Sequence, residues 1–146
     1  MPITVDVDPA FSGFNQSIIQ KIINSVFEEE GYLADDVEIV FGDDSLLNKL
    51  KKDFFNLDQL TDVIAFRLND YEDKSIEGEI YISVPRAKEN AIEFSEPFAK
   101  EIGRLIIHGG LHLLNYDDQT AADKAIMTGK EDEYLQQCQW RKIIDE

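Results

Sequence analysis

Two histidines, His108 and His112, are the only histidines of the 146-residue chain and stand four positions apart. On an α-helix, residues at this spacing lie on one face, roughly 5 to 6 Å apart between Cβ atoms. Neutral imidazole is a common zinc ligand, so two imidazoles at that separation can bind one metal ion. The spacing therefore indicates a shared metal site, although such pairs also occur on helix surfaces that bind no metal.

A carboxylate follows the histidines closely enough to complete such a site. Asn115 tolerates the left-handed backbone conformation that ends many helices, so we expect the helix to end near it and the chain to turn back. That turn can bring Tyr116, Asp117 or Asp118 toward the histidine face. Two imidazoles, one carboxylate and one open position are typical of catalytic zinc sites. Aspartates after a helix also serve as turn and cap residues, which is the alternative interpretation.

Two glycines, Gly109 and Gly110, separate the histidines. Each glycine in a helix interior costs about 1 kcal/mol relative to alanine, and nothing in the local sequence offsets that loss. The pair therefore predicts either close packing of the helix against its neighbours or open space beside a ligand.

The length and composition of the chain predict one folded domain, residues 1–146. We expect the protein to be cytoplasmic. A chain of this length with 43% hydrophobic residues can bury a sizeable core. No stretch approaches the roughly 18 apolar residues of a membrane span, and the N-terminus does not resemble a signal peptide. We therefore expect a soluble protein with no membrane partner. The single cysteine, Cys138, cannot form an internal disulfide and is expected to be inert.

The net charge of −16 argues against a non-specific nucleic-acid-binding protein, because phosphate contacts require lysine and arginine. The acidic runs at 28–30 and 43–44 are expected to be solvated faces of helices and turns. Recognition of a nucleic acid by so acidic a chain would then depend on a partner.

Hydrophobic periodicity predicts an α+β fold, with one mixed four-stranded sheet covered by helices. Alternating patterns predict strands at residues 3–7, 37–41, 62–66 and 79–84, the last of them ended by Pro85. Helical patterns are found at 14–27, through 46–50, from Ser95 to about Asn115, and at 121–144. The metal site is thereby expected at the C-terminal end of a late helix.

The stretch from His108 to Asp118 resembles the signature of the YbeY family of metal-dependent endoribonucleases, His-Gly-x-Leu-His-Leu-x-Gly-Tyr-Asp-His. Further blocks resemble those of the family in the same order, and together the blocks cover about residues 47 to 135. They are Leu47-Asn48, 61–66, 78–83 and Met127 with Glu131 and Leu135.

The resemblance implies a zinc-dependent hydrolase that cuts single-stranded RNA in 3′-end maturation of 16S ribosomal RNA and in ribosome quality control. It implies one metal ion per chain, with His108 and His112 as the first two ligands. The third is Asp118, where most members have histidine, and Asp117 is the alternative. A carboxylate leaves zinc coordination possible and makes manganese or nickel less easily excluded. The small ribosomal subunit or an assembly factor is the expected partner.

The resemblance leaves the general base and the phosphate-binding groups open. Candidates for the general base, each of which could instead be structural, are Asp62, Glu79, Glu101 and Asp117. Many members of the family carry an arginine shortly before the Thr-Asp block, and the matching position here is about Phe55. Candidates for RNA binding, each of which could instead be solvated surface, are Lys51, Lys52, Arg86 and Arg104.

The leading hypothesis is metal-assisted phosphodiester hydrolysis, in which the ion lowers the pKa of bound water toward about 7 and polarises a phosphoryl oxygen. A zinc metallopeptidase is one alternative, because His-x-x-x-His is also the zincin spacing. Gly109, however, stands where that chemistry places a glutamate base. The other alternative is a ribosome-associated binding module with a structural metal.

Overall fold

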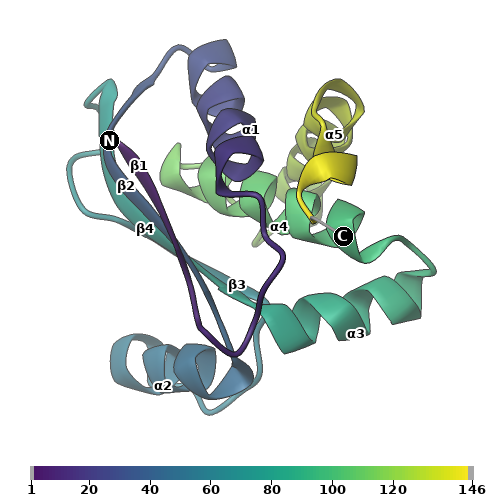
Figure 1. The fold of residues 1–146 in the computed structure, drawn as a ribbon. Coiled ribbons are helices and arrows are strands. Elements are labelled where there is room, and N and C mark those ends of the chain that lie inside the picture. Colours follow the sequence, from purple (N-terminus) through teal and green to yellow (C-terminus); the bar gives the residue numbers. More distant parts are fainter. Residues whose placement is uncertain (1, 145–146) are drawn as a thin grey trace.

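The computed structural model describes residues 2–144, which form one mixed four-stranded sheet with helices on both sides (Figure 1). The strand order is β1-β2-β4-β3, in which β1, β2 and β4 run parallel and β3 is antiparallel to β4. The strands are β1 (Ile3–Val7), β2 (Leu33–Gly42), β3 (Val63–Arg67) and β4 (Ser75–Ser83). The predicted α+β architecture is confirmed, and β3 is an edge strand.

Five α-helices and one short 3-10 helix surround the sheet in the described residues. They are α1 (Gln16–Glu29), α2 (Asp44–Phe55), α3 (Val84–Phe94), α4 (Phe98–Leu113), α5 (Ala121–Gln137) and η1 (Trp140–Lys142). Figure 1 shows α1, α4 and α5 together on one side of the sheet and α2 on the other. None of the helices at residues 2–144 is long and apolar enough to span a membrane.

Helix α4 packs closely against both the sheet and α1. A Cβ atom on Gly109 would lie 2.6 Å from Cγ2 of Ile80 on β4, closer than side chains can approach. A Cβ on Gly110 would lie 3.4 Å from Cγ1 of Ile23 on α1. The two glycines therefore face the core. Of the two expected alternatives, close packing is confirmed at Gly109, whereas a Cβ on Gly110 would make an ordinary van der Waals contact. The histidines face away from that core contact.

One helix was not predicted, and two predicted helix bounds were wrong. Residues 84–94 form α3, in which Pro85 lies in the first turn, where its fixed φ and missing N–H are tolerated. Ser83 caps this helix by accepting a hydrogen bond of 3.2 Å from the backbone N of Arg86. Ser95 ends α3 in a left-handed conformation, so α4 begins only at Phe98.

The last helix ends at Gln137, short of the predicted residue 144. Cys138 adopts an extended conformation (φ −102°, ψ 166°), and the chain continues into η1. This extended residue breaks the helical periodicity that the apolar residues on either side of it had indicated.

Candidate metal centre

The last turns of α4 and the loop after it bring together the two histidines and Asp118. Asn115 has a φ of 73°, so the predicted left-handed turn is present just after the helix. Beyond it, Oδ1 of Asp117 accepts hydrogen bonds from the backbone N atoms of Asp118 (2.7 Å) and Gln119 (3.2 Å). These contacts hold the loop in the conformation that turns Asp118 back toward α4.

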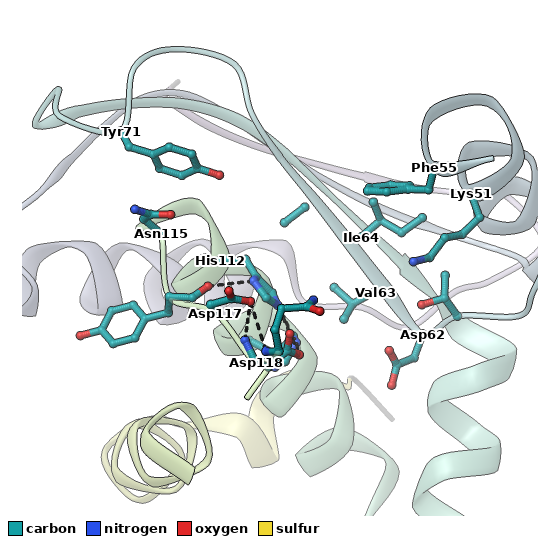
Figure 2. A pocket seen from close by; sticks show the side chains of 15 residues that line it. Lys51, Phe55, Asp62, Val63, Ile64, Tyr71, His112, Asn115, Asp117 and Asp118 are labelled. Atoms are coloured by element: carbon teal, nitrogen blue, oxygen red, sulfur yellow. Dashed lines mark hydrogen bonds and ion pairs between the residues drawn. The ribbon is translucent and has the colours of Figure 1, made fainter. Parts of the chain in front are cut away.

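Three potential ligand atoms converge at this point (Figure 2). The Nε2 atoms of His108 and His112 are 3.0 Å apart, and Oδ2 of Asp118 lies 3.6 Å from the first and 3.7 Å from the second. Tetrahedral coordination with bonds of about 2.0 to 2.2 Å separates ligand atoms by roughly 3.4 Å. The three atoms therefore already stand at nearly the spacing that a single zinc ion requires.

The hydrogen bonds of the two imidazoles fix which ring nitrogen carries the proton. Nδ1 of His112 lies 3.0 Å from the carbonyl oxygen of Tyr116, and Nδ1 of His108 lies 2.6 Å from Oε2 of Glu131. Carbonyl and carboxylate oxygens only accept, so both Nδ1 atoms donate. In the neutral rings both Nε2 atoms then present lone pairs to each other and to a carboxylate. A cation between them satisfies this arrangement.

The environment of His112 favours its neutral form. Burial and the neighbouring His108 lower the pKa of His112, and the opposing effect of the nearby Asp118 carboxylate is smaller. A neutral imidazole is the form that binds a metal ion. The side chains of His108, His112 and Asp118 are 16%, 29% and 33% exposed, so an ion and a substrate can reach them from solvent.

A buried ion-pair network supports His108 from the side away from the cleft. Arg104 donates from Nη1 to Oε1 of Glu131 (3.2 Å) and from Nε and Nη2 to the two oxygens of Glu101 (2.8 and 2.6 Å). Burial alone would lower the pKa of Arg104, but the carboxylates of Glu101 and Glu131 raise it by more than burial lowers it. The pKa therefore lies above its ordinary value, and the guanidinium stays charged. The Glu131 carboxylate is consequently held in place by Arg104 while it accepts from His108.

The same network reaches the opposite wall of the site. The amide of Asn90 donates to Oε2 of Glu101 (3.0 Å) and to Oδ2 of Asp62 (2.9 Å). Asp62 precedes β3 and lines the cleft, whereas Glu101 is a buried residue of α4 that does not line it. A chain of hydrogen bonds thus connects His108 to Asp62, a carboxylate that lines the cleft.

The histidines and Asp118 form part of a cleft of about 400 Å³, within the usual size range of ligand sites. Its walls come from α2, edge strand β3, the β3–β4 loop and the loop after α4 (Figure 2). The residues that contribute besides His108, His112 and Asp118 are Lys51, Phe55, 61–65, Tyr71, Asn115, Tyr116, Asp117 and Gln119.

Two of the four candidate bases line this cleft, Asp62 and Asp117. Asp117 is occupied by the backbone hydrogen bonds of its own loop. Glu79 accepts a hydrogen bond from the hydroxyl of Tyr81 (3.0 Å) and does not line the cleft. Glu101 is buried in its ion pair with Arg104.

Of the four candidate RNA-binding residues, only Lys51 lines the cleft. Lys52 pairs with Asp58 at 3.7 Å, and Arg86 with Asp44 at 3.3 Å. Arg104 lies in the buried network behind His108. These three side chains therefore do not contribute positive charge to the cleft in this conformation.

No role in the site was predicted for Glu131 or Tyr71. For Glu131 a signal existed: Met127, Glu131 and Leu135 fall on one face of α5, and an acid on a buried apolar face requires a partner. For Tyr71 there was none, because its position depends on how the loop after β3 folds over the cleft.

Comparison with known proteins identifies one family. The family model described as "Endoribonuclease YbeY" matches residues 9–139. Proteins named "Endoribonuclease YbeY" from Flavobacterium psychrophilum and Karelsulcia muelleri are among the similar relatives. The first is 41% identical over 77% of this chain and 79% of its own length, and the second 37% identical over 86% and 87%. The solution structure of TM1509 from Thermotoga maritima matches with a TM-score of 0.62 and 26% identity, over 92% of this chain and 87% of that one.

Proposed function

The chain belongs to the YbeY family of endoribonucleases, and on that basis we propose that it is a metal-dependent endoribonuclease that cleaves single-stranded RNA. One observation supports the metal dependence above all. Two imidazole lone pairs and a carboxylate oxygen converge within 3.0 to 3.7 Å in a solvent-accessible cleft. We propose His108, His112 and Asp118 as the ligands of one zinc ion per chain, with manganese or nickel as possible replacements.

A divalent ion at this position would supply a Lewis acid that polarises a phosphoryl oxygen and acidifies water. The chain's own residues provide the rest. Glu131 and the carbonyl of Tyr116 orient the two imidazoles, and the hydrogen bonds accepted by Asp117 hold the third ligand. These three side chains would hold the ion with the number of protein ligands that is usual in catalytic rather than structural zinc sites.

We propose Asp62 as the general base. It lines the cleft, and its Oδ2 atom accepts a hydrogen bond from the amide of Asn90, which leaves Oδ1 able to accept a proton. Among the four candidates it is the cleft carboxylate that is engaged neither in its own loop nor in a buried ion pair. Asp62→Asn is expected to lower the cleavage rate about 10²- to 10⁴-fold, the usual contribution of a general base.

Lys51 is the proposed phosphate contact. It is the one Lys or Arg side chain among the described residues that line the cleft, and Figure 2 shows it reaching in from α2 beside Phe55. A single ammonium can stabilise a substrate phosphate as a point charge.

The proposed substrate is the 3′ region of 16S ribosomal RNA, and the proposed setting is cytoplasmic ribosome maturation and quality control. Family membership supports this assignment, and the net charge of −16 supports dependence on a partner. An acidic protein binds bare RNA weakly, so the small ribosomal subunit or an assembly factor would supply the missing affinity.

A peptidase is disfavoured by the packing of Gly109, whose Cβ position faces Ile80 in the core. A glutamate at this position could therefore not reach the cleft. The alternative function, a ribosome-associated binding module with a structural metal, differs in its expected activity. Such a module would hold the ion without cleaving RNA.

The proposal is tested by removing metal from the protein with a chelator and then adding zinc, manganese or nickel. Cleavage of labelled single-stranded and duplex RNA is measured before and after the addition. We expect metal-dependent cleavage of the single strand, its loss in His112→Ala, and no loss in Cys138→Ser, which lies outside the described cleft. Cleavage by folded His112→Ala at the wild-type rate would refute the assigned site. Stoichiometric metal without cleavage would instead favour the binding module.

A further inference from the structure

Two half-exposed aromatic rings lie at the rim of the cleft. The side chains of Phe55 and Tyr71 are both cleft-lining residues, and each residue is 45% exposed. Figure 2 shows them on opposite sides of the cleft, with His112 and Asp118 between them. They come from separate elements, the C-terminal end of α2 and the β3–β4 loop. Neither ring is needed to fill the main core.

The ring of Tyr71 is held in place from one side. The guanidinium carbon of Arg67 lies 5.4 Å from its centroid. Arg67 itself is fixed, because it donates to the carbonyl oxygens of Leu113 (2.7 Å), Asp70 (2.9 Å) and Asp73 (3.0 Å). This arginine therefore joins the end of α4 to the loop that carries Tyr71. Ordering of the ring before a ligand binds reduces the entropy that binding must overcome.

Phe55 is supported by a small aromatic cluster at the sheet edge. Its ring lies 6.0 Å from that of Phe66 on β3 at an interplanar angle of 20°, and Phe66 also contacts Phe54 at 5.2 Å. The Nζ atom of Lys51 lies 4.7 Å from the Phe55 centroid. An ammonium beside an exposed ring provides contacts for a phosphate and a base within one turn of α2.

We propose that Tyr71 and Phe55 are stacking platforms for the unpaired bases on either side of the RNA phosphate that enters the metal site. The inference rests on the proposed nuclease function and names how its substrate is held. Base stacking on aromatic side chains tolerates any sequence, because every base has a π-face. Bases in a duplex are already stacked on each other, so these platforms favour single strands.

The charges of the cleft favour this mode of binding over a purely electrostatic one. Asp62, Asp117 and Asp118 surround the site, and Lys51 alone among the described lining residues is a lysine or arginine. Phosphate neutralisation can therefore provide little of the affinity, and stacking has to provide more. A protein partner would need a continuous apolar surface, whereas here the two rings are separated by carboxylates and imidazoles.

Binding of a labelled single-stranded oligoribonucleotide tests the inference, with the full-length chain in EDTA so that the RNA stays intact. Tyr71→Leu and Phe55→Leu are each expected to weaken binding about 5- to 150-fold, the equivalent of about 1 to 3 kcal/mol per stacked base. Tyr71→Phe and Phe55→Tyr keep a ring and should bind like the wild type. Phe94→Leu, an exposed phenylalanine on α3 outside the cleft, is the matched control.

An oligoribonucleotide with abasic positions provides the second arm. It should bind the wild type more weakly than the intact strand, and each leucine variant, which keeps one of the two rings, should distinguish the two strands less strongly than the wild type does. Folded leucine variants that bind intact RNA as tightly as the wild type, or that lose no more affinity than Phe94→Leu, would overturn the inference.

Cleavage measured separately distinguishes this inference from the proposed function. One outcome is that the metal-loaded wild type cleaves RNA while the leucine variants bind and cleave it as well as the wild type does. That result would refute the stacking role of Tyr71 and Phe55 and support the proposed nuclease function. If no metal restores cleavage while the leucine variants lose affinity, the platforms stand and the nuclease is refuted.

Discussion

The Nδ1 atom of His108 on α4 lies 2.6 Å from the Oε2 atom of Glu131 on α5, and Arg104 holds the other oxygen of that carboxylate. Carboxylates placed behind a metal-binding histidine fix its tautomer and raise its basicity. The proposed metal site is therefore built from two helices and a loop, although its ligands all fall within residues 108–118.

Glu131→Gln is expected to weaken zinc binding about 10- to 100-fold, because the amide keeps the shape of the side chain but loses the charge behind His108. Competition with a chromophoric chelator measures this affinity. Glu133→Gln changes an exposed acid two residues away on α5 and should leave the affinity unaltered. Equal affinities for the two variants would show that Glu131 has no role in tuning the site.

Substitution of Asp118 separates the third-ligand candidates. Elemental analysis of purified protein should find one metal per chain in the wild type and substantially less in Asp118→Ala. Asp118→His should retain the metal, because imidazole is also a zinc ligand. If Asp117→Ala loses the metal and Asp118→Ala keeps it, Asp117 is the ligand.

The two helical glycines Gly109 and Gly129 should respond oppositely to alanine. Gly109→Ala places a Cβ 2.6 Å from Cγ2 of Ile80, and overpacking of about 1 to 3 kcal/mol outweighs a helix-propensity gain of about 1 kcal/mol. Gly129 has open space around its Cβ position, so Gly129→Ala should stabilise α5 by about 1 kcal/mol or less. Urea unfolding measures both, and a Gly109→Ala variant as stable as Gly129→Ala would contradict the packing.

Glu30 should make stability depend on acid pH. Burial alone raises its pKa, but hydrogen bonds from Tyr116, Tyr134 and Lys130 together outweigh burial and lower it below the ordinary 4.5. Because the folded-state pKa is the lower one, the stabilisation is fully present above the unfolded-state value and is lost as pH falls through the folded value.

Glu30→Gln should therefore be less stable than the wild type at neutral pH, and the difference should shrink as the pH falls below about 4.5, the ordinary value. Urea unfolding at several pH values measures it. Glu29→Gln changes the exposed last residue of α1, directly before Glu30, and should show a smaller difference at neutral pH. A gap between Glu30→Gln and the wild type that widens toward acid pH would contradict the assigned role.

Binding to bare RNA should depend only weakly on salt. The slope of log affinity against log salt is about −0.7 for each phosphate neutralised on a single strand, and Lys51 is the one lysine or arginine among the described cleft residues. We expect a slope shallower than about −2, obtained by titrating labelled RNA at increasing salt. A steep slope that Lys51→Met does not change would place the RNA on another surface.

The sequence predicted those parts of the site that depend on local geometry. The i,i+4 spacing of His108 and His112 and the left-handed turn at Asn115 follow from helix periodicity and backbone preference. The pairing of His108 with Glu131 was not predicted, because 23 residues and the packing of α5 separate the two side chains. Helix α3 was missed for a local reason, since Pro85 ends a strand and begins a helix with equal ease.

The contact between His108 and Glu131 sets the order in which the site can form during synthesis. A nascent chain that has emerged as far as Asp118 carries all three proposed ligands, but it lacks the carboxylate that orients His108. Only after α5 has been made and has docked on α4 does Glu131 reach that imidazole. Full metal affinity should therefore be acquired only after α5 has docked on α4.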